Sequence, residues 1–492
     1  MSNVWSMLDN IGDSINPIVV KELRQAVQGR FVTGALLLLL LVQLVMIAFA
    51  LLVEQNTTLD AGQTLFMWLL GVLLFVSLFF IPVYTGGRLA AERADNNVDL
   101  LFITTLSPVS IIWGKMLAGL IITLLIYSAC LPFMTFTYFL RGIDIPSILV
   151  VLILTVAIVT TFIQIGVFLA CLPVGKVFRA LIGLGAFGSL FITFGSTMGM
   201  CYGILSSGVG SMLGTWEFWG PATMVIVFFL VGIGLFFVLS VAVVSPPASN
   251  RAFPVRVYLV AVWIITGITL GGSAIQTNSF EPIAAWIGIC TGVAGLALIS
   301  SVCERETLTR RIRRTIPTNP ISRIVAFFFY SGSANGLIWS LAFMGITLLI
   351  GATLAETITR FKDRGDLDKA ILMGFGTTMY FFNYSMTALL IRRLLPGDKV
   401  KPFLTWIFVV ILMALGSAVP PILAFLISFE SADTTWLLLN PYAFVIDSAG
   451  KSQWLFFFVV SIWGLAVLGI HLKWLLTQIR NFTPLTPAPV SE

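Results

Sequence analysis

Residues 16–53 read "NPIVVKELRQAVQGRFVTGALLLLLLVQLVMIAFALLV", and this stretch joins two different patterns. Its second part, residues 32–53, is a run of 22 residues without a single charge. A helix that crosses a membrane needs roughly 20 apolar residues, so this run predicts a span. The part before it, residues 16–31, mixes charged and apolar side chains and predicts an amphipathic helix in the membrane interface.

The whole chain has an apolar composition like that of residues 32–53. Of 492 residues, 58% are hydrophobic and 10% are charged, whereas soluble domains have about 25% charged residues. We therefore predict an all-α polytopic membrane protein with about twelve transmembrane helices. The twelve apolar runs are 32–53, 64–84, 112–139, 147–172, 180–203, 222–244, 257–275, 283–303, 336–355, 370–391, 403–428 and 454–472.

The basic residues between these runs predict the orientation. If both termini are cytoplasmic, 22 of the 28 lysines and arginines lie on the cytoplasmic side and 6 on the other side. Lysine and arginine favour cytoplasmic loops, so this asymmetry supports the arrangement. One span more or fewer would abolish it, and we therefore expect an even number of spans with cytoplasmic N- and C-termini.

The stretch 16–31 has the features of an interfacial helix. Asn16 is a good N-cap, and a proline follows it in the first turn. Val19, Leu23 and Val27 recur every four residues and predict an apolar stripe, whereas Lys21 and Arg24 face away from it. A general membrane anchor and half of a docking surface are both consistent with this pattern.

A second cytoplasmic segment, residues 88–110 between the second and third spans, predicts a docking element. It contains acids followed by a short apolar cluster. Acidic side chains beside an anionic leaflet are unfavourable, so we expect a protein partner here rather than lipid headgroups. The candidate docking residues are Glu92, Asp99, Leu100, Leu101, Phe102 and Leu106.

The chain offers few groups for chemistry. It has one histidine, His471, and five cysteines without metal-type spacing, so we expect no metal, no cofactor and no catalysis by this chain itself. The sequence "AGKS" at 449–452 is not a phosphate loop, because Val445 stands where the motif needs glycine. If ATP drives this protein, another chain binds it.

The spans contain no charged residue in their middle thirds, which argues against ion or proton coupling. Gln43, Gln164 and Asn383 are their main polar residues. Hydrogen bonds between helices and the lining of a substrate path both account for them.

The two cytoplasmic segments, in this order, resemble those of the membrane permeases of type-2 ATP-binding-cassette (ABC) transporters. The resemblance covers roughly residues 16–244. It implies a permease, by family an exporter, in a bacterial plasma (inner) membrane, with a separate ABC ATPase as partner and with a second permease copy as a further candidate. No nucleic-acid partner is expected. The matching positions are the run Lys-Glu-Leu-Arg-Gln at 21–25, Glu92, Asp99-Leu100-Leu101, Ser107-Pro108 and Gly114-Lys115.

The resemblance also suggests an organisation for the chain. We expect a six-span unit at 1–250, with a stretch at 204–221 that is either a re-entrant hairpin or a surface loop. This unit is followed by an additional pair of spans at 251–303, a basic cytoplasmic linker at 304–335 and a four-span unit at 336–492. The linker has six arginines, which either bind anionic lipid or follow the general charge asymmetry; "NPI" recurs in it at 319–321.

Two other classes of function remain alternatives to a permease. One is an ion- or proton-coupled secondary transporter, which would have to use groups such as Gln164 and Asn383. The other is a non-transporting membrane scaffold or an intramembrane enzyme, for which the sequence shows no catalytic groups. The sequence does not identify a substrate.

Overall fold

The structure, a computed structural model, is almost entirely helical and contains no strand among the residues it describes. The prediction of an all-α polytopic membrane protein is confirmed. The chain forms two compact units, Met1–Ser245 and Pro246–Glu492, which we call the first and the second unit. The described residues are 16–53, 61–94, 107–140, 142–173, 175–246, 248–359, 364–395, 402–428, 436–441 and 453–485.

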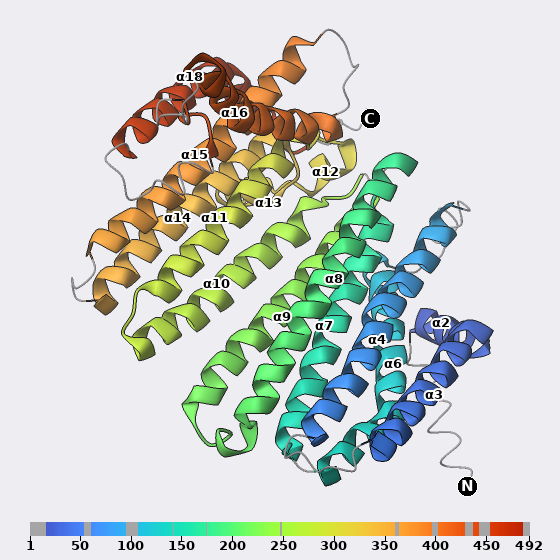
Figure 1. Cartoon of the computed structure of the whole chain (residues 1–492). Helices are drawn as coiled ribbons and strands as arrows, with labels where there is room; N and C mark the ends of the chain where they lie inside the picture. The colour runs from blue at the N-terminus through green and yellow to red at the C-terminus, as the bar shows by residue number, and fades with distance from the viewer. Residues whose placement is uncertain are drawn as a thin grey trace, which may run out of the picture. The chain divides into compact units, whose positions relative to one another are not determined.

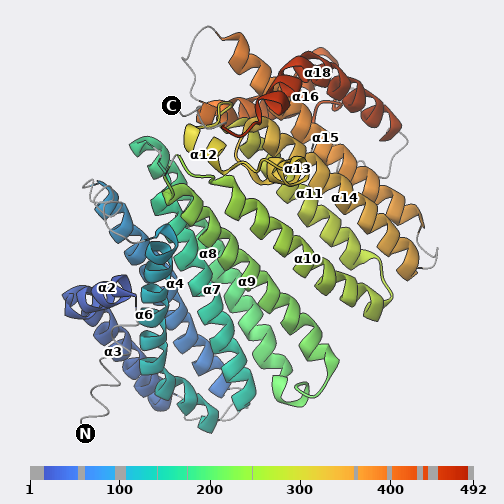
Figure 2. The same cartoon turned by 180° about the vertical axis from the view of Figure 1, so that it is seen from behind.

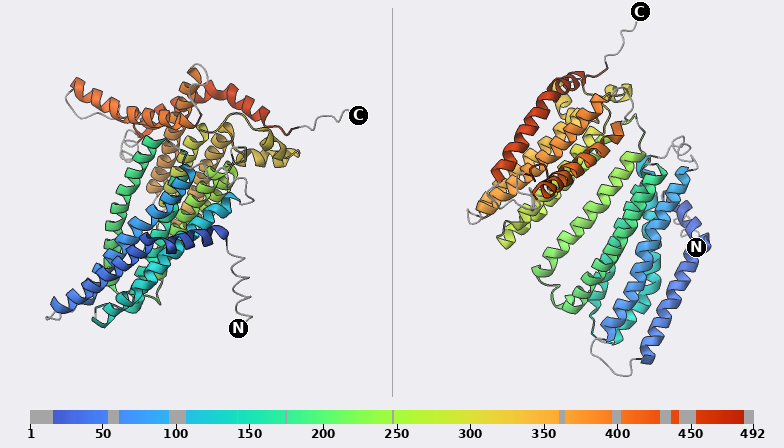
Figure 3. Two further views of the ribbon diagram at one scale, coloured as in Figure 1. Left: turned by 90° about the vertical axis from the view of Figure 1, so that its right-hand side faces the viewer. Right: turned by 45° about the horizontal axis from the view of Figure 1, so that its top comes forward.

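In its described residues, the first unit has one short helix followed by six long ones (Figure 1). The short helix, α2 (Pro17–Gln28), runs across the direction of the long helices rather than along them (Figure 3). Two 3₁₀ turns, η1 (Thr137–Leu140) and η2 (Val209–Ser211), follow α6 and α8. The helices are α2 (Pro17–Gln28), α3 (Arg30–Val53), α4 (Ala61–Ala94), α6 (Pro108–Phe136), α7 (Ile145–Cys171), α8 (Lys176–Ser207) and α9 (Trp216–Val244).

Helices α4 and α7 form the centre of the first unit, and each packs against several of the others. Their backbones meet at two glycines. A Cβ atom on Gly86 of α4 would lie 2.8 Å from the carbonyl oxygen of Gly166 of α7, and one on Gly166 would lie 2.8 Å from that of Pro82. No larger residue fits this contact without movement of a backbone, so α4 and α7 are closely coupled.

The described part of the second unit contains two short helices between its long ones. Helix α11 is at its centre and packs against α10, α14, α15 and α16. The predicted parts 251–303, 304–335 and 336–492 all lie within this one compact unit. Its elements are α10 (Ala252–Thr277), α11 (Glu281–Val302), α12 (Arg310–Thr315), α13 (Pro320–Phe329), α14 (Ser333–Thr359), α15 (Arg364–Leu394), η3 (Pro402–Leu404), α16 (Thr405–Ser428) and α18 (Gln453–Asn481).

Eleven helices of the described chain are long and apolar enough to cross a membrane. They correspond to eleven of the twelve predicted spans. The twelfth, 370–391, lies in α15, which is 31 residues long but is not among the eleven. Its polar side chains, including Thr377, Thr378 and Asn383, lower its apolar character. Nevertheless, α15 packs against the spans α11, α14 and α18.

The stretch 204–221 consists of the end of α8, the turn η2 and the start of α9. Its turn is attached to α7, because the Asp144 carboxylate accepts a hydrogen bond from Gly210 N at 2.8 Å. Trp216 and Trp219 are 58% and 48% exposed. Exposed tryptophans are common at the membrane–water boundary.

Candidate functional site

The start of α2 is attached to the start of α6. The Asn16 side chain caps α2 by accepting a hydrogen bond from Ile18 N at 3.0 Å. The same side chain donates to the carbonyl oxygen of Ser110 at 2.7 Å. Next to this contact, a Cβ on Gly114 of α6 would lie 2.9 Å from Cβ of Ile18. The capping asparagine and the absence of a side chain at Gly114 therefore allow α2 and α6 to approach closely.

Two faces of α2 are apolar, and they have different surroundings. The face that packs inside the unit contains Ile18, Val19, Glu22 and Ala26. The predicted stripe only partly overlaps it: Val19 is 1% exposed, Leu23 is half-buried and Val27 is 65% exposed. The second apolar face carries this stripe, and an open groove of about 430 Å³ runs along it. The groove is lined by Val19, Val20, Leu23, Arg24, Val27, Leu117 and Ile121. The polar–apolar pattern fits a helix with one side on the protein and one in the membrane interface.

A buried lysine joins three helices of the first unit. Lys115 of α6 is 4% exposed, and its Nζ lies 2.7 Å from Glu22 Oε1 of α2 and 2.8 Å from Glu92 Oε2 of α4. An ammonium group removed from water is stable only when it is paired in this way. Each carboxylate has a second cation: Lys21 lies 3.2 Å from Glu92, and Arg88 Nε lies 3.4 Å from Glu22.

Arg88 extends this network along α4. Its Nη1 donates a hydrogen bond to the Tyr84 hydroxyl at 2.8 Å, and its Nη2 donates to the Gln25 side chain. We call the set Lys21, Glu22, Gln25, Arg88, Glu92 and Lys115 the α2 network. Its charged members are three cations and two anions, so it carries one net positive charge. It fixes α2 to both α4 and α6.

The structure describes only one of the six predicted docking residues. Glu92 is described and is paired within the chain, with 22% of its side chain exposed. Asp99, Leu100, Leu101, Phe102 and Leu106 lie outside the described residues, which stop at Ala94 and resume at Ser107. Both flanks of this segment lead directly into the α2 network, through Glu92 before it and Lys115 after it.

Of the predicted interfacial residues, Lys21 contacts Glu92, whereas Arg24 lies on the exposed side and contributes to the groove. Sequence reasoning did not single out Glu22 and Arg88 as members of a site. A signal was present for Glu22, because it stands four residues from both Ile18 and Ala26 and so shares their face of the helix. Its partner is 93 residues away in the chain.

The three polar residues predicted inside the spans are all completely buried. Gln164 Nε2 of α7 donates to the Ser240 hydroxyl of α9 at 3.3 Å. Asn383 Nδ2 of α15 donates to the carbonyl oxygen of Val460 of α18 at 2.9 Å. Gln43 is buried on α3. Gln164 and Asn383 thus join pairs of helices, as polar side chains in membrane proteins often do.

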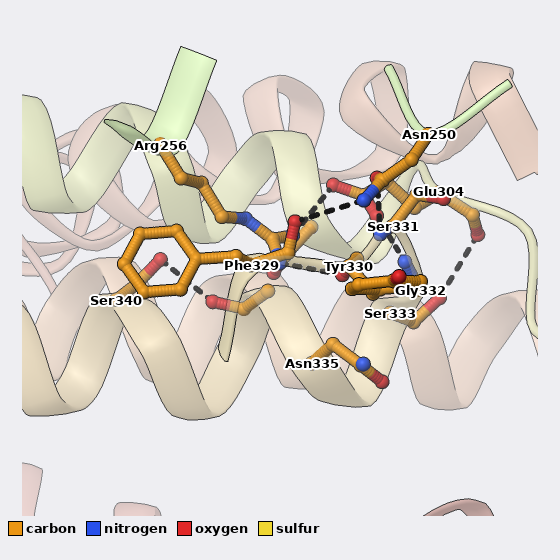
Figure 4. A network of polar contacts seen from close by, with 12 residues as sticks. Asn250, Arg256, Glu304, Phe329, Tyr330, Ser331, Gly332, Ser333, Asn335 and Ser340 are labelled. Atoms are coloured by element: carbon orange, nitrogen blue, oxygen red, sulfur yellow. Dashed lines mark hydrogen bonds and ion pairs between the residues drawn. The ribbon is translucent and has the colours of Figure 1, made fainter. Parts of the chain in front are cut away.

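A second polar network holds α13 in the second unit (Figure 4). Arg256 of α10 donates to the carbonyl oxygens of Phe328 at 2.9 Å and Tyr330 at 2.7 Å, and it pairs with Glu304 at 3.0 Å. Asn250 Nδ2 donates to the carbonyl oxygen of Phe329 at 3.2 Å. The last carbonyl groups of α13, which lack partners within the helix, are therefore satisfied by side chains.

Glu306, two residues after Glu304, forms a separate set of polar contacts with α15 and α18. It pairs with Arg392 at 2.5 Å and Arg393 at 2.9 Å, and it accepts a hydrogen bond from Trp474 Nε1 at 3.1 Å. Burial alone would raise the pKa of the Glu306 carboxyl. The hydrogen bonds and charges of the two arginines outweigh burial and hold this pKa below its ordinary value.

Within the described residues, no group of three or more His, Cys, Asp or Glu side chains could hold a metal ion. The described helices define a polytopic membrane protein with the architecture of a transporter. No family model, curated protein or solved structure matches the chain.

Proposed function

We propose that this chain is the membrane permease subunit of a type-2 ABC transporter in a bacterial plasma membrane, and that it acts as an exporter. Both termini lie in the cytoplasm, with α15 as the twelfth span. ATP is bound and hydrolysed by a separate ATPase subunit, which docks on segment 88–110. A second copy of the permease completes the transport path.

The α2 network is the observation that supports this proposal best. It connects both flanks of the predicted docking segment to one interfacial helix through Lys115, which is 4% exposed. A force applied by a docked ATPase to residues 95–106 would therefore reach α2, α4 and α6 together. A membrane anchor alone would need the apolar face of α2 but not a buried lysine paired with two carboxylates.

The packing of the first unit offers a route for the motion beyond the network. Gly86 lies two residues before Arg88 and touches the backbone of Gly166 in α7. Helix α7 in turn packs against α9. A displacement of the cytoplasmic end of α4 would thus move α7, because closely packed backbones shift as rigid bodies rather than deform.

The test is to co-express the full chain with the ATPase encoded in the neighbouring reading frame and to substitute Leu100→Asp and Leu101→Asp together. We expect the ATPase to stop co-purifying and its stimulation by the permease to fall at least tenfold, because charged groups would replace apolar contacts. The matched control is Leu394→Asp with Leu395→Asp. That leucine pair also lies on the predicted cytoplasmic side, and it is 73% and 39% exposed.

Unchanged co-purification and stimulation in the Leu100/Leu101 variant would show that the docking assignment is wrong. Transport that a protonophore abolishes, and that survives depletion of ATP, would instead indicate an ion-coupled carrier. The proposed ABC permease should instead lose transport on ATP depletion and keep it with the protonophore, so the two mechanisms give opposite results.

A further inference from the structure

Helices α12 and α13 form a hairpin, residues 309–330, at the end of the second unit where α11 ends and α14 begins (Figure 2). The Tyr330 hydroxyl closes it by donating to the carbonyl oxygen of Thr315 at 2.7 Å. Its inner side is apolar: Ile316 and Phe327 are buried together with Phe482. The rings of Phe327 and Phe482 meet edge to face with centroids 5.3 Å apart. The hairpin is therefore a fixed element of the unit.

The polar network around Arg256 determines how α13 is oriented. Arg256 and Asn250 bind the carbonyl oxygens of its last two residues and of its C-cap, Tyr330, and Asn335 Nδ2 of α14 donates to the carbonyl oxygen of Phe327 at 2.8 Å. At its other end, the Asn319 side chain caps the helix by accepting from Ile321 N at 3.1 Å. The contacts of Arg256, Asn250 and Asn335 fix the C-terminal end of α13 to neighbouring elements, so the face it directs outward is a constant feature.

That outward face is apolar. Ile321, Ile324 and Val325 are 75%, 63% and 56% exposed. They stand at positions i, i+3 and i+4 and so form one stripe. Exposed branched apolar side chains on a short helix beside a membrane span are typical of a helix whose face enters the membrane interface. Only three residues separate the end of α13 from the start of α14, which keeps this stripe close to the membrane.

The other helix of the hairpin is positively charged. On α12, Ile312 is buried, whereas Arg310, Arg311 and Arg314 are exposed on the opposite side. None of these three arginines forms an ion pair with an acid in the described part of the chain. By contrast, the buried arginine of the second unit, Arg256, is paired with Glu304. The three exposed guanidinium groups are thus available to an anionic partner.

We propose that the α12–α13 hairpin binds anionic lipid headgroups of the leaflet in which the second unit is embedded. The arginines of α12 bind headgroup phosphates, for which the planar guanidinium is well suited. Ile321, Ile324 and Val325 enter the upper acyl region beside them. Charge alone would suit other anions, but an exposed apolar stripe on the same hairpin as the charges, in an element that continues into a span, fits a lipid. This proposal does not depend on the proposed ATPase partner.

The test uses the detergent-purified full chain, titrated with dioleoylphosphatidylglycerol or dioleoylphosphatidylcholine, with bound lipid counted by native mass spectrometry. Each basic residue near an anionic surface contributes about fivefold in affinity. Arg310→Gln with Arg314→Gln should therefore weaken binding of phosphatidylglycerol at least tenfold and leave phosphatidylcholine unchanged. The matched control is Lys473→Gln with Arg480→Gln, two exposed cations of the same unit, and it should change the affinity less than threefold.

A second variant tests the apolar stripe. Ile321→Ser with Ile324→Ser should also weaken phosphatidylglycerol binding, while leaving its dependence on salt unchanged because the arginines remain. Equal losses in the arginine pair and the control pair would indicate general surface charge and would overturn the proposal. Phosphatidylglycerol binding that neither hairpin variant alters would also overturn it. All four substituted hairpin residues are exposed, so the thermal unfolding temperature should stay the same.

Discussion

Replacement of Lys115 by methionine should release α2 from the first unit. The substitution keeps an apolar chain of similar length and removes the charge that joins Glu22 to Glu92. Removal of one partner from a buried ion pair costs about 3–5 kcal/mol, because the other charge is left uncompensated. Glu22 keeps Arg88 at 3.4 Å and Glu92 keeps Lys21 at 3.2 Å. We therefore expect the lower end of that range, about 3 kcal/mol.

The assay is hydrogen–deuterium exchange of the α2 amides, residues 17–28, in the full chain. A loss of about 3 kcal/mol corresponds to exchange that is about 100-fold faster. The matched control is Lys21→Met. Lys21 contacts the same Glu92 but is 56% exposed, and exposed pairs contribute about 0–1 kcal/mol. Exchange in this control should therefore accelerate less than about tenfold.

A double-mutant cycle tests the cause. If Lys115 acts through Glu22, the combined variant Glu22→Gln with Lys115→Met should lose at least 1 kcal/mol less than the sum of the single variants. Two results would refute the reasoning. One is equal acceleration in the Lys115→Met and Lys21→Met proteins. The other is single losses that add within about 0.5 kcal/mol, which would mean that the two side chains act independently.

Two further predictions concern other parts of the structure. Gly86→Ala should lower the thermal unfolding temperature of the purified chain, because its Cβ would lie 2.8 Å from the carbonyl oxygen of Gly166. Gly87→Ala is the control: its Cβ would have nothing within 4 Å, so the unfolding temperature should stay unchanged or rise. Equal effects of the two substitutions would contradict the close α4–α7 contact. The lowered pKa of Glu306 stabilises the folded state above the ordinary carboxyl pKa, and that stability is lost as the pH falls through the lowered value. Glu306→Gln should therefore lower the unfolding temperature at pH 7 and show a smaller further loss on acidification than the unsubstituted chain; parallel pH profiles would exclude this carboxyl as the cause.

The fold class and most of the spans could be predicted because they depend on local composition. A run such as 32–53 has no alternative to a membrane helix, and helix α3 occupies Arg30–Val53. Helix α15 was harder, because Asn383 and its hydroxyl-bearing neighbours lower the apolar average that defines a span. Its packing against α11, α14 and α18 depends on contacts that no single stretch of sequence contains.

The α2 network shows where prediction from one sequence stops. The limits of the interfacial helix were predicted closely, as 16–31 against Pro17–Gln28. The face it buries was not, because apolar residues at 18–20, 23 and 26–27 cover more than one side of the helix. Glu22 belongs on the buried side only if Lys115 is there to pair with it, and that pairing arises from the approach of α2 to Gly114. The spacing within α2 places Glu22 on the face of Ile18 and Ala26, but it does not reveal the partner of this carboxylate.

Each unit places a short helix against its long ones and holds it in the same general way. Both helices begin with Asn-Pro-Ile, with the asparagine side chain as cap. In both, a buried cation from a long helix makes the main attachment: Lys115 for α2 and Arg256 for α13. A short helix has too few side chains to fix its direction by apolar contacts alone, and a charged hydrogen bond at a defined position restricts it more strongly.

The two attachments nevertheless differ in what they bind, and the difference fits the two proposed roles. Lys115 binds two side chains at the same time, Glu22 and Glu92. Because the lysine side chain is flexible, these ion pairs can persist through a small displacement of α2 by a change of rotamer. Arg256 binds main-chain carbonyl oxygens at the end of α13, which no change of rotamer can withdraw. A helix held in this way suits a fixed lipid contact, whereas a helix held by ion pairs between flexible side chains suits a part that follows the motion of a docked ATPase.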